Sequence, residues 1–430
     1  MMKILNADSP EFEEELQRLL RRGGVTEEAV LASVREIIDD VARRGDDALF
    51  DYALRFDESP LDAGNVRVPD EEIDRALDGL DPADRDVLVL AAERIERFHR
   101  RQVQQSWFTI DEDGTELGQL VRPLRRVGVY APGGLAPYPS TVLMAAIPAR
   151  VAGVQEVLLV TPAKAGYVSP LILAAARIAG VDHIYRVGGP QAIAALACGT
   201  ESIPAVDKIV GPGNRYVAAA KRLVFGTVGI DMIAGPTEVL IIADETASPV
   251  FIAADLLAQA EHDELASSIL ITPSGNLAER VAEEVDRQLQ ELPRESIAAS
   301  SISRYGRAVV TGNLEEAVAL ANRFAPEHLE LMVTAPRELL GMIENASAVF
   351  LGSQTPEAIG DYVAGPNHIL PTAGTARFSS PLGVYDFVKR TGLVSFTGRS
   401  LDRIGDAAAR FATLEGLDAH AISVKRRRTP

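Results

Sequence analysis

The chain has 430 residues, of which 47% are hydrophobic and 24% charged, enough to build the cores of about two to three globular domains. Its net charge of −18 argues against nucleic acid or an anionic membrane surface as a partner. No stretch has the apolar length of a membrane span, no signal-peptide core follows the N-terminus, and a single cysteine excludes an internal disulfide or a cysteine-rich zinc site. These features predict a cytoplasmic enzyme or binding protein.

The first 120 residues predict a helical N-terminal region with few strands. Apolar residues recur there at helical spacing among many charges, as along the face formed by Val30, Val34, Ile37 and Val41. His99 lies in the charged run RIERFHRRQ and is expected at the surface.

From Val121 onward, short β-branched runs alternate with helical runs, and this alternation predicts parallel sheets with crossover helices. A break near Gly235-Pro236 divides the strand candidates into a group of four and a group of five. We therefore expect an α/β fold of two Rossmann-like doubly wound modules, at 121–236 and 237–381, and a small C-terminal tail domain at 382–430. The strand candidates are 126–130, 156–161, 183–187, 208–210, 239–243, 268–272, 308–311, 329–333 and 348–351, with one more at 393–397 in the tail.

Two pairs of polar side chains stand out in the second module. Gln259 and His262 are three residues apart at the end of an apolar helix, so they point from one face and either share a metal ion or form a hydrogen-bonded helix end. Glu327 and His328 lie between a helix and a strand, and ligands of α/β sheets gather outside the carboxyl ends of strands. This pair either exchanges protons with a substrate or is a capping glutamate beside a surface histidine.

Two further stretches place acidic residues near histidines. The turn-rich run GDYVAGPNH holds Asp361, which can bind a cation, and His368, which either binds substrate or hydrogen-bonds to the backbone. Near the C-terminus, Glu415 and His420 would lie about 140° apart on an ideal helix. They can face one site only if the backbone is irregular at Gly416.

Three glycine-rich turns follow strand candidates and open helices, where backbone N–H groups can bind an anion such as pyrophosphate. They are Tyr130–Gly134, Val187–Gln191 and Val210–Asn214. None of them is the G-x-G-x-x-G fingerprint of dinucleotide sites, so each is either an anion-binding turn or a tight turn alone.

Five strings of residues occur in the order found in one family: VGPGNRYV, QAEHD, APEHLEL, GDYVAGPNHILPT and ARFSSPL. With EGLDAH near the C-terminus, they resemble the histidinol dehydrogenase family over nearly the whole chain. The resemblance implies oxidation of L-histidinol to L-histidine with two NAD+ and water, through an enzyme-held aldehyde, with one zinc ion per subunit. It also implies an intertwined homodimer, in which the C-terminal tail reaches the active site of the partner.

The resemblance also assigns roles to individual residues. The implied proton acceptors are Glu327 and His328. The implied zinc ligands are Gln259, His262, Asp361 and His420. The implied substrate contacts are these four residues together with Thr237, His328 and Glu415, and the implied contacts to the nicotinamide cofactor are Tyr130, Gln191 and Asn214. The first module would then be the NAD side, and the second would carry zinc and catalysis.

Two positions depart from the family pattern. Thr237 stands where serine is usual but keeps a hydroxyl, and Pro190 stands where a small residue is usual. The nearest alternative is a related zinc- and NAD-dependent dehydrogenase acting on a sulfonated diol, but the carboxylate of Glu415 better suits a cationic amino alcohol. More remote are a zinc hydrolase, which would not need three glycine-rich turns, and a non-catalytic α/β binding protein, which would not need Glu327 beside His328.

Overall fold

The computed structural model describes residues 2–22, 28–133 and 137–428, and the contacts within it define two units. The first unit runs to Gln102 and resumes over Arg125–Phe387, and the second combines Val103–Leu124 with the chain from Val388 onward. The contacts thus group the chain differently from the four consecutive segments expected from the sequence. Within the described residues, no helix has the length and apolar character needed to cross a membrane.

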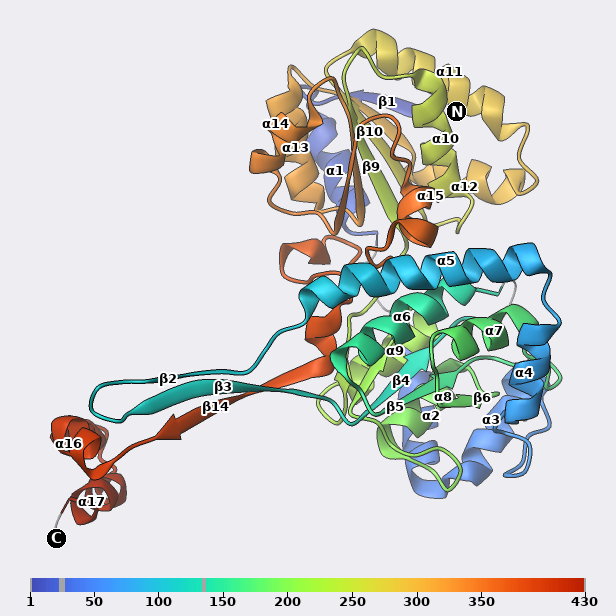
Figure 1. The fold of residues 1–430 in the computed structure, drawn as a ribbon. Coiled ribbons are helices and arrows are strands. Elements are labelled where there is room, and N and C mark those ends of the chain that lie inside the picture. The colour runs from blue at the N-terminus through green and yellow to red at the C-terminus, as the bar shows by residue number, and fades with distance from the viewer. Residues whose placement is uncertain (1, 23–27, 134–136, 429–430) are drawn as a thin grey trace. The chain divides into compact units, whose positions relative to one another are not determined.

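The first unit contains two parallel sheets (Figure 1). The smaller one has the strand order β6-β5-β4-β7-β8. In chain order this is 3-2-1-4-5, the order of doubly wound dinucleotide-binding folds. Four of these strands are the predicted ones, and the two-residue β8 is added at the edge. The strands are β4 (Arg126–Tyr130), β5 (Glu156–Val160), β6 (His183–Tyr185), β7 (Lys208–Val210) and β8 (Gly229–Ile230), and the helices that connect them are α6 (Pro139–Ala152), α7 (Pro170–Ile178), α8 (Gly189–Cys198) and α9 (Arg215–Val224).

The larger sheet repeats the same order, because β11-β10-β9-β12-β13 is again 3-2-1-4-5, with β1 added beside β11. Four of the strand candidates therefore lie in the smaller sheet and five in the larger one, on either side of Gly235-Pro236 in the chain. The strands are β1 (Lys3–Asn6), β9 (Glu238–Ala243), β10 (Ser267–Thr272), β11 (Arg307–Val310), β12 (His328–Met332) and β13 (Ala348–Leu351). The helices are α1 (Phe12–Leu20), α10 (Pro249–Ala260), α11 (Gly275–Leu289), α12 (Glu295–Tyr305), α13 (Leu314–Phe324), α14 (Pro336–Leu339) and α15 (Glu357–Ile359).

Strand β9 shows why this larger sheet is covered on both faces. Its residues alternate between two hydrophobic clusters: Val239 and Ile241 pack with α10, α11 and α12, whereas Leu240 and Ile242 pack with α1 and α13. Figure 1 shows these two groups of helices on opposite sides of β9 and β10. Because both faces are buried, polar side chains of this sheet can reach solvent or a ligand only near the strand ends.

The first 120 residues form helices as predicted, but they do not form one region. The face of Val30, Val34, Ile37 and Val41 is buried within the core of the smaller sheet, while β1 and α1 belong to the larger sheet. The expectation for His99 was wrong: its side chain is fully buried, and Nδ1 donates to the carbonyl of residue 95 at 2.8 Å. The other helices of this region are α2 (Glu28–Arg44), α3 (Asp46–Asp57), α4 (Asp70–Asp78) and α5 (Pro82–His99).

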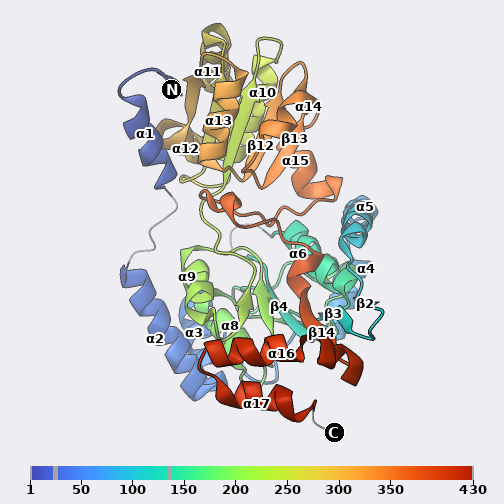
Figure 2. The same ribbon diagram turned by 90° about the vertical axis from the view of Figure 1, so that its left-hand side faces the viewer.

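The second unit is an antiparallel sheet followed by two helices. The sheet has the order β14-β3-β2, and its strand β14 covers the first part of the strand predicted at 393–397. Figures 1 and 2 show the two helices, α16 and α17, packed side by side. The elements are β2 (Trp107–Ile110), β3 (Glu116–Pro123), β14 (Val388–Ser395), α16 (Gly398–Leu414) and α17 (Asp418–Arg426).

Candidate active site

A cavity of about 770 Å³ opens at the carboxyl ends of β4, β5, β6 and β7. The three predicted cofactor contacts, Tyr130, Gln191 and Asn214, all line it. The Tyr130 hydroxyl accepts a hydrogen bond from the N–H of Gly189 at 3.2 Å, and the Asn214 side chain caps the N-terminus of α9. This is the edge at which doubly wound sheets bind dinucleotides.

The side chain of Gln191 shows that this cavity is built for a polar ligand. It is fully buried, yet within the described chain neither its amide nitrogen nor its amide oxygen has a hydrogen-bond partner. Polar groups in protein interiors are nearly always paired, so a ligand that brings hydrogen-bond donors and acceptors fits here. The residues present therefore suit a nicotinamide dinucleotide.

A second cavity, of about 320 Å³, holds most of the predicted catalytic residues. It shares Pro132 and Tyr138 with the wall of the first cavity, so the two adjoin. The turn after β7, at 211–213, also contributes to its wall. The predicted site residues that line it are Thr237, His262, Glu327, His328, Asp361 and His368.

The position of the Glu327–His328 pair corrects one expectation. His328 is the first residue of β12, so the pair lies at the amino end of its strand and not outside a carboxyl end. The neighbouring strand β9 begins at Glu238, and the parallel register places His328 opposite Val239. Thr237 consequently lies beside Glu327, because both immediately precede adjacent parallel strands.

Glu327 is held by two donors from the start of β9. Its Oε2 accepts hydrogen bonds from the Thr237 hydroxyl at 2.5 Å and from the N–H of Glu238 at 2.9 Å. Burial raises the pKa of Glu327 to about 7, against the opposing effects of His328 and these donors. A carboxyl group with a pKa near neutrality is suited to gain or lose a proton during a reaction. The threonine at position 237 thus has a direct role in holding Glu327.

His328 is buried between carboxylates. Nδ1 lies 3.3 Å from the carbonyl oxygen of Glu238, which can only accept, so Nδ1 carries the proton and Nε2 faces Asp361 Oδ1 at 3.4 Å. Burial lowers the pKa of His328, but Glu357, Glu327 and Asp361 outweigh it and raise that pKa well above the usual value. The positive charge of a bound divalent cation would offset the negative charge of these carboxylates. It would therefore favour the neutral form of the imidazole, which a general base requires.

Glu357 is a site residue that the sequence analysis missed. Its carboxylate is buried, and Oε1 lies 3.6 Å from Nδ1 of His328. With its nitrogen turned toward this carboxylate, at 2.6 and 3.0 Å, the amide of Gln259 places its oxygen 2.9 Å from the N–H of Glu238 and 2.6 Å from the Thr237 hydroxyl, which donates its one proton either to this oxygen or to Glu327. The sequence did contain one signal for Glu357: it precedes Asp361 by four residues, and residues four apart lie on one face of a helical turn.

Two more histidines present one ring nitrogen to the second cavity. Nδ1 of His262 donates to the carbonyl of Ala258 at 3.0 Å, and Nδ1 of His368 donates to that of Asp361 at 2.9 Å. In a neutral ring bonded in this way the other nitrogen, Nε2, is an acceptor, and that of His368 lies 3.4 Å from the Thr141 hydroxyl. A hydrogen bond from Nδ1 to a backbone carbonyl is the usual way in which proteins orient a histidine for metal or ligand binding.

The donors around the second cavity fit a zinc ion. Ligand atoms of His328, Glu357 and Asp361 lie within 4.8 Å of one another. Nε2 of His328 is buried without a hydrogen-bond partner among the described residues, and His262 lines the same cavity. Zinc takes such nitrogen and oxygen ligands. Of the zinc ligands predicted from the sequence, Asp361 belongs to this cluster of three and His262 lines the same cavity, whereas His328 and Glu357 were not in the predicted set.

The remaining predicted residues, Glu415 and His420, lie in the second unit. Glu415 ends α16, Gly416 has a φ of 73°, and His420 lies in the first turn of α17. The backbone is therefore irregular at Gly416, which is the condition under which the two side chains could face one site. Both side chains are exposed, and their roles stay predictions.

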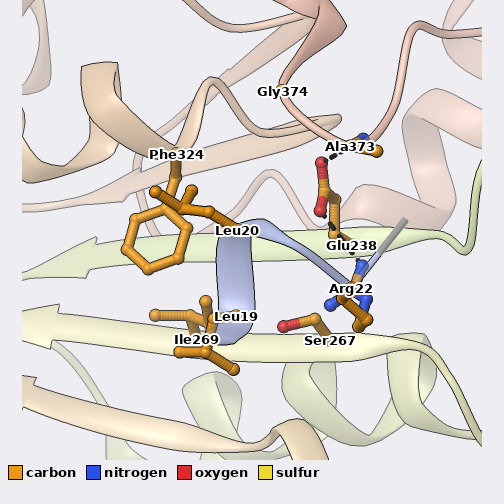
Figure 3. Close-up of a pocket in the computed structure, with 9 residues that line it drawn as sticks. All are labelled: Leu19, Leu20, Arg22, Glu238, Ser267, Ile269, Phe324, Ala373 and Gly374. Atoms are coloured by element: carbon orange, nitrogen blue, oxygen red, sulfur yellow. Dashed lines mark hydrogen bonds and ion pairs between the residues drawn. The ribbon is translucent and has the colours of Figure 1, made fainter. Parts of the chain in front are cut away.

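A buried ion pair supports the segment that carries Thr237 (Figure 3). Arg22, just after α1, donates to the carbonyl oxygens of Pro236 and Thr237 at 3.3 Å and to Glu238 Oε2 at 3.0 Å. The other oxygen of Glu238 accepts from the N–H of Ala373 at 3.0 Å. These contacts connect α1 to the start of β9.

Arg22→Ala should strongly destabilise the protein, because it leaves the Glu238 carboxylate buried without its cation. Removing one partner of a buried pair costs about 3–5 kcal/mol in free energy of unfolding. Arg43→Ala is the matched control: its pair with Asp40 is exposed, with 74% of the Arg43 side chain accessible, and should cost about 1 kcal/mol or less. Urea denaturation measures both, and similar losses for the two variants would contradict the role given to Arg22.

Two adjoining cavities, one at a dinucleotide-binding edge and one with a buried acid–base pair, define a dehydrogenase-like α/β enzyme. A family model described as histidinol dehydrogenase matches residues 20–428. The histidinol dehydrogenase of Geobacter metallireducens is 55% identical over 98% of this chain and 97% of its own, and that of Aquifex aeolicus is 51% identical over 99% and 98%. The chain therefore belongs to the histidinol dehydrogenase family, a family of zinc- and NAD-dependent oxidoreductases.

A solved structure agrees with the sequence relatives. The crystal structure of histidinol dehydrogenase from Elizabethkingia anophelis superposes with a TM-score of 0.93 at 38% identity, over 99% of this chain and 98% of that one. The resemblance drawn from the sequence strings is thus confirmed, as is the α/β fold with parallel sheets.

Proposed function

We propose that this chain is a histidinol dehydrogenase, which oxidises L-histidinol to L-histidine in two steps, through an aldehyde that stays bound. The observation that carries the proposal is the buried Glu327–His328 pair, in a cavity that adjoins the one lined by Tyr130, Gln191 and Asn214. A proton acceptor and a hydride acceptor must both lie near the reacting carbon, and two adjoining cavities meet that requirement.

The residues of the second cavity and the tail bind the reacting groups. Gln259, His262, Asp361 and His420 would hold the zinc ion, one per subunit, while Thr237, His328 and Glu415 would add contacts to the substrate. When bound, NAD+ supplies the hydride acceptor and zinc a positively charged template for the amino alcohol. The carboxylate of Glu415 faces the substrate ammonium group.

His328 and Glu327 divide the proton transfers. In the alcohol step, the imidazole of His328 takes the hydroxyl proton while the carbon loses a hydride. In the aldehyde step, Glu327 accepts a proton from the water that adds to the carbonyl carbon, while His328 returns the proton it took in the alcohol step to the carbonyl oxygen, so that a neutral hydrate forms. The neutral imidazole of His328 then takes a hydroxyl proton of the hydrate as the carbon loses the second hydride. Its pKa of about 7 allows Glu327 to accept the proton of the water and release it again.

The subunits are arranged as an intertwined homodimer in this proposal. The segment 121–236 is the NAD side, the segment 237–381 carries zinc and catalysis, and the tail at 382–430 reaches the active site of the partner. The cytoplasmic location stays a prediction from the sequence.

The direct test of function is the stoichiometry of the reaction. Purified protein with L-histidinol and NAD+ should form two NADH for each histidinol consumed, with histidine as the product. A sulfonated diol offered in its place should give no NADH. One NADH per histidinol with release of the aldehyde, or turnover of the diol alone, would overturn the proposed function.

Glu327→Gln should slow the aldehyde step more than the alcohol step, because only the aldehyde step needs a proton removed from water. Loss of a positioned base costs about 10²–10⁴-fold in rate. The two steps are measured separately by supplying L-histidinol or L-histidinal. Glu315→Gln, which removes an exposed carboxylate from α13, is the control. An equal loss in both steps would refute this division of roles.

A further inference from the structure

A buried ion pair that the proposed reaction does not use lies in the wall of the second cavity. It joins Lys221, on α9, to Asp231, just after β8, and the two side chains are 3% and 0% exposed. Both residues line the cavity that holds Glu327 and His328. Because taking two charges out of water costs free energy, a buried pair is weak evidence for stability, and its role is found in what it holds.

The pair holds both backbone groups of Gly211, the first residue of the turn that follows β7. The N–H of Gly211 donates to Asp231 Oδ2 at 2.8 Å, and its carbonyl oxygen accepts from Lys221 Nζ at 2.9 Å. The other carboxylate oxygen of Asp231 accepts from the N–H of Met232 at 2.6 Å. The two peptide groups that flank the Cα of Gly211 are thus each fixed by a charged side chain.

Gly211 also lies directly against the end of strand β4. Its φ is 110°, and a Cβ atom at this position would lie 2.1 Å from the carbonyl oxygen of Tyr130, the last residue of β4. Only glycine fits this close approach without a shift of the backbone. Contact with β4 and hydrogen bonds to the ion pair therefore fix the position of the turn together.

This turn contributes to the walls of both cavities. Residues 211–213 line the cavity of Glu327 and His328, and the next residue, Asn214, lines the adjoining cavity. A displacement of the turn would therefore alter both walls at once. Reacting atoms must be held about 3–3.5 Å apart, and a misplacement of about 1 Å can cost about 100-fold in rate even when its cause is remote from the chemistry.

We propose that Lys221 and Asp231 are positioning residues for hydride transfer, because they hold the 211–213 turn as a rigid wall between the two cavities. The inference rests on the proposed function, since it assigns the pair to that reaction. In this role each side chain acts through the backbone of Gly211. A pair with a structural role alone would raise the free energy of unfolding and leave the kcat of the folded enzyme unchanged.

Lys221→Met tests the proposal, because methionine nearly keeps the length of the side chain and removes the donor to Gly211. On folded protein with L-histidinol and saturating NAD+, kcat should fall by about 10- to 100-fold, while KM for L-histidinol should change by less than about three-fold. With deuterium on the carbinol carbon of L-histidinol, the isotope effect on kcat should be at least as large as in the wild type. Lys221→Arg keeps a cation with donors and should have a higher kcat than Lys221→Met.

A second lysine of the same sheet provides the matched control. Lys208, the first residue of β7, lies 3.5 Å from Asp386 and lines neither cavity, so Lys208→Met should leave kcat unchanged. Lys221→Met leaves the Asp231 carboxylate buried without its cation. The double variant Lys221→Met/Asp231→Asn removes both charges and is therefore measured alongside it, together with the melting temperature of every variant.

The outcomes separate the positioning role from the proposed function. A folded double variant with wild-type kcat and only a lower melting temperature would overturn the positioning role and leave the proposed function intact. Equal losses of kcat in Lys208→Met and Lys221→Met would overturn the positioning role as well. A wild type that forms no NADH from L-histidinol would overturn the proposed function, and the positioning role with it.

Discussion

His328→Asn should lower kcat by about 10²–10⁴-fold for both L-histidinol and L-histidinal, because each hydride departure needs a hydroxyl proton removed by the same base. Asparagine can still donate a hydrogen bond toward the carbonyl of Glu238. The decrease in kcat would therefore result from the absence of the Nε2 lone pair. That nitrogen faces Asp361 Oδ1 at 3.4 Å and has no hydrogen-bond partner among the described residues, which leaves it available to a substrate.

The measurement is steady-state NADH formation with each substrate, with KM and zinc content determined on the same samples. His183→Asn is the control: it removes an imidazole from the start of β6, away from both cavities. A His328→Asn enzyme that retained more than about a tenth of wild-type kcat with L-histidinol would exclude His328 as the base. A rise in KM alone would assign it a binding role.

The sequence pattern was sufficient for the two parallel sheets but not for their edges. The central strands are β-branched runs buried on both faces, and such runs are visible without any knowledge of their partners. Strand β1 spans four residues, of which one is buried, and it joins the sheet only through its parallel pairing with β11, some 300 residues later in the chain. Local patterning contains no trace of such a distant pairing.

In the candidate site, too, residues that are neighbours in the sequence were predicted, and residues that meet only in the folded chain were not. Glu327 and His328 were found because they are adjacent in the chain, whereas Glu357 was missed because its link to His328 depends on how α15 packs beside β12. The burial of His99 was also missed: the residues around it in the sequence are charged, but at the end of α5 its ring packs against Asn367, whose Nδ2 lies 3.5 Å from Nε2 of the ring. Side chains that meet only through tertiary packing are beyond the reach of spacing arguments.

The second unit offers a physical reason for a shared active site. Its helices α16 and α17 have few buried residues, while Phe411 and Leu414 are 66% and 69% exposed. Apolar side chains of this size are stabilised when another surface covers them, and in a two-fold dimer the partner can provide that surface. Glu415 directly follows this exposed stretch, and His420 lies in the first turn of α17, so docking of the tail would carry both toward a site.

Two inactive variants, His262→Asn and His420→Asn, should therefore restore activity when they are unfolded together and refolded. In a mixed dimer with shared sites, one site collects both lesions and the other has neither. Random mixing makes half of the dimers mixed, each with one intact site of two, so activity should recover to roughly a quarter of the wild-type value. Each variant refolded alone, as the control, should stay inactive.

The outcome depends only on which chain supplies His420. If His420 served the site of its own chain, every site in the mixed dimer would carry one lesion, and no activity would return. Differential tagging must show that mixed dimers formed, because their absence would also prevent recovery. When mixed dimers are present, their zinc content is a second measurement, because only the intact site retains all four proposed ligands. About one tightly bound zinc ion per mixed dimer is expected if the sites are shared. None is expected if each chain completes its own site.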